Sequence, residues 1–295
     1  MQSASFYLEL LLSGITVGSL YALIAIGYTM VYGILRLINF AHGDIFMMGG
    51  FFMIFISSSM SPALAIPLVL LMTVALGLAV ERAAYKPLRS APRMSVMISA
   101  IGVSYLLQNL ATYITGGLAR PYPEIPFLKQ TFTIGAMSIK AITIVTPVLT
   151  ILLVVALVLF INNTKIGMAM RAVSKDFSTA RLMGIKVNSV ISSTFIIGSL
   201  LAGVGSILYF SNYGQVSPTI GAMPGLKAFV AAVFGGIGSI PGAVIGAYII
   251  GICESFIKSS DSIAIFSNAF TFALLIVVLL FKPNGMFGEK LTEKV

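Results

Sequence analysis

Long apolar stretches separated by short polar segments dominate this chain. The first uncharged run covers residues 10–35, and further apolar stretches cover residues 45–58, 63–80, 94–118, 142–161, 190–212 and 263–281. A membrane-spanning helix needs about 20 mostly apolar residues, so we predict a helix at each stretch. The first run follows no basic segment and is too long for the core of a signal peptide, so we expect it to be retained.

The stretch 226–257 has a different pattern. It is 32 residues long, holds a single acid, Glu254, and is interrupted by Gly-Gly-Ile-Gly-Ser-Ile-Pro-Gly at 235–242. Glycine and proline this close together interrupt a helix. We predict a hairpin of two short helices that returns to the side from which it came, with one long tilted helix as the alternative. In a transporter such a break either lines the substrate route or is a packing kink.

The composition indicates a fold that has lipid as its solvent. Of the 295 residues, 58% are hydrophobic and 9% are charged, and the mean hydropathy is +1.03. A soluble domain carries about 25% charged residues, far more than this chain, so the composition excludes a soluble domain. The high hydrophobic content also excludes a disordered chain. Cys253 is the only cysteine, which excludes a disulfide scaffold. We predict an all-α fold over residues 1–295, a single polytopic transmembrane bundle of about seven to nine helices, including broken or re-entrant short ones.

Basic residues gather in two loops between apolar stretches. The 18 Lys and Arg outnumber the 9 Asp and Glu, for a net charge of +9, of which residues 81–93 contribute +3 and residues 162–189 contribute +4. This is the positive-inside bias of a membrane protein rather than a nucleic-acid-binding patch. We therefore place both loops in the cytosol.

Counting spans from these loops predicts the rest of the topology. The proline-rich loop 119–141 and residues 213–225 fall outside, and so does the N-terminus. The tail falls inside, in agreement with its lysines, Lys282, Lys290 and Lys294. Both placements hold only if 226–257 returns to the outer side.

Ionisable residues precede the shortest apolar stretch. That stretch, after Asp44, has only about 14 residues, so residues 37–44 contribute to the span and Asn39, His42 and Asp44 lie partly within the membrane. Inserting an ionisable group at the centre of the membrane costs a free energy of about 2.5–3.5 kcal/mol, so such a group is expected to have a bonding partner or a functional role. Asn39 and Asp44 either cap helix ends, with Asp44 favoured by the helix dipole, or they line a substrate pathway with His42.

Gln108 and Asn109 are adjacent polar residues within 94–118, and we expect their amides to bond to another helix or to water in a cavity. They are either interhelical contacts or pathway residues. The candidate pathway residues are thus Asn39, His42, Asp44, Gln108, Asn109, Gly236, Gly238 and Ser239. Two glycine pairs have the spacing typical of close helix contact, Gly14 with Gly18 and Gly242 with Gly246.

The loop 162–189 has the pattern of a short amphipathic helix at the membrane surface. Ser174 is suited to cap it, Asp176 to its first turn and Gly184 to its end. One face carries Phe177, Ala180, Arg181 and Gly184. Such a helix binds anionic lipid or docks into the groove of a partner, and the small residues favour the partner.

Sequence motifs for catalysis are missing. No Gly-Lys pair occurs, so the chain has no P-loop and we expect no ATP hydrolysis by that route. His42 is the only histidine, which leaves too few ligands for a zinc enzyme. We expect no catalytic residue, no metal site and no cofactor on this chain.

Several segments together resemble known permeases. They include Ile-Asn-Phe-Ala-His-Gly-Asp at 38–44 and Phe-Gly-Gly-Ile-Gly-Ser-Ile-Pro-Gly-Ala at 234–243, and the others cover 19–33, 81–89, 167–185 and 282–285. In this order, and nearly end to end, the chain resembles the LivH-type permease subunit of branched-chain amino acid ABC importers.

The resemblance implies a bacterial inner-membrane permease that moves branched-chain or related amino acids inward from a periplasmic binding protein. It also implies a second, related permease subunit and a pair of ATPase subunits that carry the ATP. The loop 162–189 would contain the segment that couples to an ATPase, with candidate residues Arg171, Asp176, Ala180, Arg181 and Gly184. The alternative is an ion-coupled secondary transporter or channel for a small polar solute, with Asp44 and Glu254 as ion sites.

Overall fold

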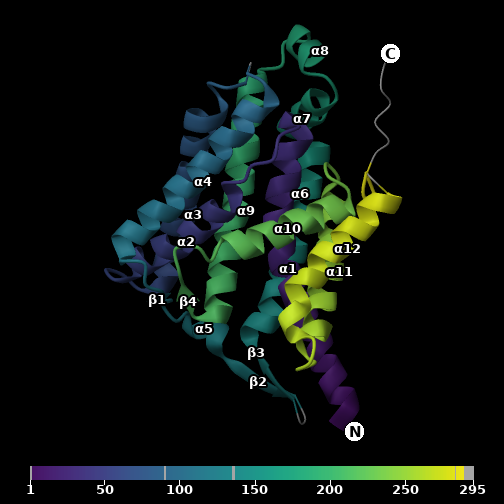
Figure 1. Cartoon of the computed structure of the whole chain (residues 1–295). Coiled ribbons are helices and arrows are strands. Elements are labelled where there is room, and N and C mark those ends of the chain that lie inside the picture. The colour runs from purple at the N-terminus through teal and green to yellow at the C-terminus, as the bar shows by residue number, and fades with distance from the viewer. Residues whose placement is uncertain (1, 90, 135–136, 283, 289–295) are drawn as a thin grey trace.

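A computed structural model describes residues 2–89, 91–134, 137–282 and 284–288. The chain forms an elongated bundle of helices (Figure 1). Two lysines that supported the predicted orientation of the tail, Lys290 and Lys294, lie outside the described residues, as does Pro283 of the segment 282–285.

The membrane-embedded part is helical. Among the described residues, seven segments are long and apolar enough to cross a membrane, and they contain α1 (Gln2–Leu35), α3 (Pro62–Val80), α4 (Arg93–Thr115), α6 (Ala141–Asn163), α9 (Val187–Tyr213), α11 (Ile240–Lys258) and α12 (Ser267–Phe281). Two shorter apolar helices join them, α2 (His42–Ser57) and α10 (Ala222–Gly235). The prediction of an all-α transmembrane bundle with seven to nine helices is confirmed.

The remaining elements lie at the ends of the bundle. They are the π-helical turn Glu81–Tyr85, the 3-10 turn Ala264–Phe266, the helices α5 (Pro126–Lys129), α7 (Lys165–Lys175) and α8 (Phe177–Leu182), and the strands β1 (Arg120–Pro121), β2 (Thr131–Ile134), β3 (Met137–Lys140) and β4 (Gln215–Val216). The antiparallel pairs β1–β4 and β2–β3 were not predicted from the sequence.

Two contacts agree with the sides assigned to the loops. The β1–β4 pair joins 119–141 to 213–225, the loops expected outside. At the opposite end, the Arg89 guanidinium donates to the side-chain oxygen of Asn188 and so joins the two basic loops. Each pair of loops therefore lies on one side of the bundle, as the charge pattern predicts.

Helix α1 lies at the centre of the bundle, in contact with α6, α9, α10 and α11 (Figure 1). Its glycines allow α11 to approach closely. A Cβ atom added to Gly14 would lie 2.7 Å from the Cα of Ile252, and one added to Gly18 would lie 2.8 Å from the Cα of Tyr248. The predicted close contact at this glycine pair is confirmed, because no larger residue fits at this separation of the helix axes.

The second predicted glycine pair packs α11 against α10. A Cβ atom on Gly246 would lie 2.3 Å from the carbonyl oxygen of Ala231, and one on Gly242 would lie 2.5 Å from that of Gly235. The two helices are therefore held backbone to backbone.

Helices α10 and α11 form the predicted hairpin, and the single long helix is excluded. The chain turns at residues 236–239, where Gly236 and Gly238 have φ values of +111° and +100° that favour glycine. Helix α11 then runs back toward the end of the bundle that holds β4 (Figure 1). The backbone N–H groups of Met286 and Phe287 donate to the carbonyls of Phe234 and Gly235, both at 2.9 Å, so the tail satisfies the C-terminal end of α10.

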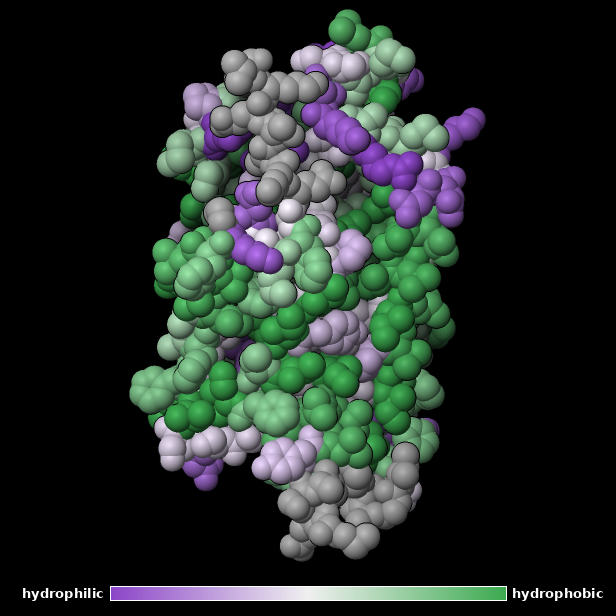
Figure 2. Space-filling model, turned by 90° about the vertical axis from the view of Figure 1, so that its right-hand side faces the viewer, coloured by the Kyte–Doolittle hydropathy of each residue, from purple (hydrophilic) through white to green (hydrophobic). Residues whose placement is uncertain are grey.

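The outer surface has an apolar belt between two more polar ends (Figure 2). Large apolar side chains are exposed on α3, α4, α6 and α12, among them Leu64, Tyr113, Leu152 and Leu280. With the seven long apolar helices, this surface makes the chain a multi-pass membrane protein.

One ion-pair cluster is buried in the bundle, between α1, α10 and α11. The Nζ atom of Lys227 lies 2.7 Å from Oε1 of Glu254, and these side chains are only 5% and 2% exposed. The Tyr21 hydroxyl donates to Oε2 of Glu254 at 2.9 Å. Lys258 also pairs with Glu254, but its side chain is 52% exposed. Burying these charges is tolerable only because each finds a partner.

The two lysines provide a matched test of this cluster. We expect Lys227→Met to lower the free energy of unfolding by up to about 3–5 kcal/mol, because it removes a buried partner of Glu254. Lys258→Met removes an exposed partner of the same carboxylate, and we expect a loss of about 0–1 kcal/mol. Thermal unfolding in detergent measures both, and equal losses would contradict the assignment.

Candidate functional site

Helix α2 begins deep inside the bundle. The ring of His42 packs so closely on Gly27 of α1 that a Cβ atom there would lie 2.1 Å from Nε2. Helix α1 continues from Gly27 to Leu35, and at a rise of 1.5 Å per residue this part of the helix is about 12 Å long. Residues 36–41 therefore return into the bundle as irregular backbone, which is tolerated in a membrane because protein buries it.

Asn39 lies in this irregular segment and is 1% exposed. Its side-chain oxygen accepts a hydrogen bond from the Tyr85 hydroxyl at 3.0 Å. The residue that precedes α2 is Ala41, and no side chain caps this helix. The interpretation of Asn39 as a cap is therefore wrong, since Asn39 instead connects the start of α2 to the π-helical turn that follows α3.

Asp44 connects α2 to α4. Its carboxylate accepts hydrogen bonds from the Ser104 hydroxyl and, at 3.0 Å, from Nε2 of Gln108. It also lies in the first turn of α2, where the helix dipole favours a negative charge. The expectation of an interhelical partner is confirmed for Gln108 and wrong for Asn109, whose exposed amide donates to the Tyr105 carbonyl of its own helix at 2.8 Å.

The N-terminal ends of α2 and α10 meet inside the bundle. A Cβ atom on Gly43 would lie 2.8 Å from the carbonyl oxygen of Gly221, and one on Gly225 would lie 3.0 Å from the Cα of Gly43. Two helix N-termini carry unpaired N–H groups and partial positive charge, which favour an anionic group. Asp44 lies one residue beyond this contact.

The residues of the predicted break lie elsewhere. Gly238 is close to Gly33, near the end of α1, since a Cβ atom on Gly33 would lie 3.7 Å from its Cα. The Ser239 hydroxyl caps α11 by accepting from the Gly242 N–H at 3.2 Å. Of the eight predicted pathway residues, Asn39, His42, Asp44 and Gln108 lie around the start of α2 and Gly236, Gly238 and Ser239 lie at the hairpin turn, whereas Asn109 belongs to neither group.

The loop 162–189 contains two helices rather than one, α7 and α8. Helix α7 is capped by the Thr164 hydroxyl, which accepts from the Gly167 N–H at 3.0 Å. Helix α8 is capped by Asp176, whose carboxylate accepts from the N–H groups of Ser178 and Thr179 at 2.8 and 3.1 Å. The prediction of Ser174 as the cap is wrong: its hydroxyl donates to the Arg171 carbonyl within α7, and the carboxylate two residues later is the stronger acceptor.

Gly184 ends α8 as predicted. Its φ value is +79°, and the Ile185 N–H donates back to the Ala180 carbonyl at 3.1 Å. A Cβ atom at Gly184 would meet nothing within 4 Å, so within this chain the glycine serves backbone conformation. Ala180 is buried, whereas Leu182 and Met183 are 87% and 78% exposed at the far tip of the molecule (Figure 1).

Sequence reasoning did not single out Arg36, which holds this segment to the bundle, or the buried Glu81. Arg36 has a left-handed backbone with a φ value of +54°, and its guanidinium donates to the Ser174 carbonyl at 3.2 Å. Glu81 is buried and accepts from Arg89, and also from the Ser192 hydroxyl at 3.2 Å. The only signal for Glu81 in the sequence is its position directly after the apolar stretch 63–80.

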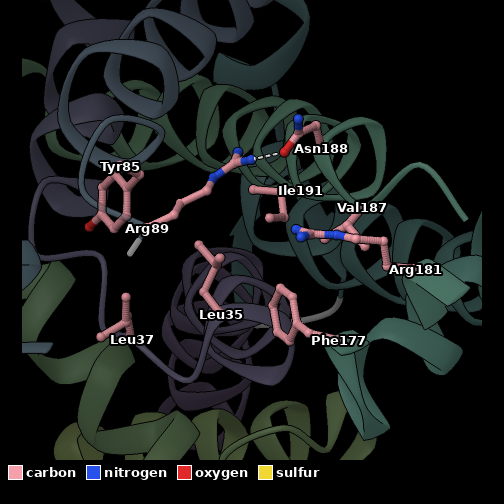
Figure 3. Close-up of a pocket in the computed structure, with 9 residues that line it drawn as sticks. All are labelled: Leu35, Leu37, Tyr85, Arg89, Phe177, Arg181, Val187, Asn188 and Ile191. Atoms are coloured by element: carbon pink, nitrogen blue, oxygen red, sulfur yellow. Dashed lines mark hydrogen bonds between the residues drawn. The ribbon is translucent and has the colours of Figure 1, made fainter. Parts of the chain in front are cut away.

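A cavity of about 330 Å³ lies between α8 and the bundle. Phe177 and Arg181 line it from α8, and Leu35, Tyr85 and Arg89 line it from the bundle (Figure 3).

Comparisons with known proteins fit this architecture. The family model for the branched-chain amino acid transport system permease component matches residues 10–279. The chain belongs to this family. It is 41% identical to the high-affinity branched-chain amino acid transport system permease protein BraD of Pseudomonas aeruginosa and 40% identical to LivH of Escherichia coli, in each case over 98% of both chains.

A more distant member is the probable branched-chain amino acid transport permease protein LivH of Methanocaldococcus jannaschii, 28% identical over 95% of this chain and 92% of its own. No solved structure matches the chain. The resemblance seen in the sequence is confirmed, and the relatives are subunits of transport systems.

The contact between His42 and Gly27 provides a test of the site. We expect Gly27→Ala to displace the imidazole ring and to reduce uptake at least tenfold, because its Cβ would overlap Nε2. Gly33→Ala is the matched control on the same helix, since its Cβ would meet no atom closer than 3.7 Å. Uptake in vesicles, normalised to the amount of inserted protein, measures both, and normal uptake by Gly27→Ala would contradict the assignment.

Proposed function

We propose that the chain is the transmembrane permease subunit of an ABC importer that moves branched-chain or related amino acids inward from a periplasmic binding protein. The observation that carries this proposal is the match to BraD and LivH over 98% of the chain. In this proposal the chain itself is not an enzyme and binds no cofactor, and ATP is bound by its partners.

The proposed partners are a second, related permease and a pair of ATPase subunits. Support comes from α8, which presents the exposed apolar side chains of Leu182 and Met183 at the tip of the polar end. Exposed apolar groups outside the lipid-facing belt mark a protein contact. We assign ATPase coupling to this segment, with Arg171, Asp176, Ala180, Arg181 and Gly184 as its candidate residues.

We further propose that this end faces the cytosol of a bacterial inner membrane. The joined loops 81–93 and 162–189 carry the positive charge, and positive loops stay inside. The N-terminus then lies outside, since Figure 1 places the start of α1 at the end opposite α8, and we place the C-terminus inside with the positive charge of Lys282.

For the substrate route we propose the region around the start of α2. A zwitterion needs a carboxylate for its ammonium group and N–H donors for its carboxylate, and Asp44 lies beside the meeting N-termini of α2 and α10. Gln108 extends this polar surface onto α4, and the turn residues Gly236, Gly238 and Ser239 are proposed to flank the cytosolic exit.

An ion-coupled transporter is less consistent with the contacts of its candidate sites. Glu254, one of the two candidate ion sites, is paired with Lys227 and Lys258. A carboxylate that exchanges protons or cations during transport needs access that these partners restrict.

Reconstitution separates the two functions. We expect leucine uptake into proteoliposomes only when the binding protein, the second permease, both ATPases and ATP are present. Uptake by this chain alone, driven by an ion gradient, would contradict the importer proposal.

The coupling assignment has its own test. We expect the double change Leu182→Ser and Met183→Ser to leave membrane insertion and thermal stability unchanged but to reduce ATPase association at least tenfold, because it removes apolar contact area at the tip. Leu118→Ser is the control, since Leu118 is 67% exposed at the opposite end of the bundle. Co-purification of the ATPases measures association, and equal association in both variants would exclude this surface.

A further inference from the structure

The cavity between α8 and the bundle has the chemistry of a binding site. Its volume of about 330 Å³ is at the lower end of the range for small-molecule sites. Figure 3 shows the Arg181 guanidinium extending over Val187 toward Ile191, at the edge of this space. One wall belongs to the cytosolic segment and the other to the membrane-embedded helices.

The cationic groups at the cavity are not fully neutralised. Arg181 forms no ion pair within the described part of the chain. Arg89 pairs with Glu81, but its buried Nε–H finds no hydrogen-bond partner among the described residues. A guanidinium offers a rigid fork of donors that matches a carboxylate or a phosphate. The electrostatics therefore favour an anion.

The rest of the lining is largely apolar. Leu35, Leu37 and Ile191 face the cavity from the bundle, and the ring of Phe177 closes it from α8 (Figure 3). A small inorganic anion would leave these apolar side chains exposed to water. An anion with a short apolar chain would bury them, which is favourable.

We propose that this cavity binds a monoanion that carries a short apolar chain, with its charged group on Arg181 and its chain against Leu35, Leu37 and Ile191. Two sources supply this chemistry, a free aliphatic carboxylate in the cytosol and an anionic phospholipid whose phosphate and part of one acyl chain would enter the cavity. A bound ligand bridges α8 and α9, so it restrains the segment to which we assigned ATPase coupling, a consequence that rests on the proposed function.

The binding test uses the full chain without ATPases, in nanodiscs of phosphatidylcholine. The probe is isovalerate, and its neutral amide, isovaleramide, is the matched ligand. We expect ligand-observed NMR titration to give saturable binding of isovalerate that is at least tenfold tighter than binding of the amide. Because the transport partners are absent, the result does not depend on whether the importer proposal holds.

The test variant is Arg181→Gln, which removes a positive charge that lines the cavity. The control is Arg171→Gln, which removes the same charge from the same loop outside the cavity. We expect Arg181→Gln to weaken isovalerate binding at least tenfold and Arg171→Gln to change it less than twofold. The second arm measures, by mass spectrometry, how much phosphatidylglycerol each variant retains from a mixed bilayer. Selective loss in Arg181→Gln there assigns the anion to lipid. If neither arm depends on Arg181, or if both variants lose binding equally, the site is excluded.

Discussion

Backbone polar groups inside a bilayer have no water to bond with, and the architecture of this chain follows from how it meets that constraint. The irregular segment before α2 is buried by protein, and the turn of the α10–α11 hairpin is satisfied by the tail. Both solutions require backbones to approach within contact distance, which explains the glycines of α1, α10 and α11. At the centre of the bundle, α11 reaches the backbone of α1 at Gly14 and Gly18.

Much of this fold could be predicted from the sequence, because in lipid an apolar run long enough to span has few other conformations. The span at 142–161, for example, appears as α6 (Ala141–Asn163), and the hairpin at 226–257 follows from its glycines and from the charge of the flanking loops. The hairpin β2–β3 was missed, because strands of four residues leave almost no periodic signal.

The candidate site was less predictable, because its contacts join residues far apart in the chain. The sequence marks Asn39 and Asp44 as polar at depth, but only the fold shows that Tyr85 and Gln108 are their partners. Lys227 and Glu254 are both visible as charged residues within an apolar stretch. Neither their spacing nor a sequence motif indicates that they pair across the hairpin. The N-cap of a helix is also hard to predict where two possible acceptors lie close together. At the start of α8, Asp176 is the cap and Ser174 is not.

The tail that closes the hairpin turn has a consequence for biogenesis. Met286 and Phe287 lie among the last ten of the 295 residues, yet they satisfy carbonyls of Phe234 and Gly235 that enter the membrane much earlier in synthesis. These residues are made only after α10, α11 and α12 have been made. The hairpin turn therefore stays incomplete while α10 and α11 are being made, and its completion depends on residues that follow α12.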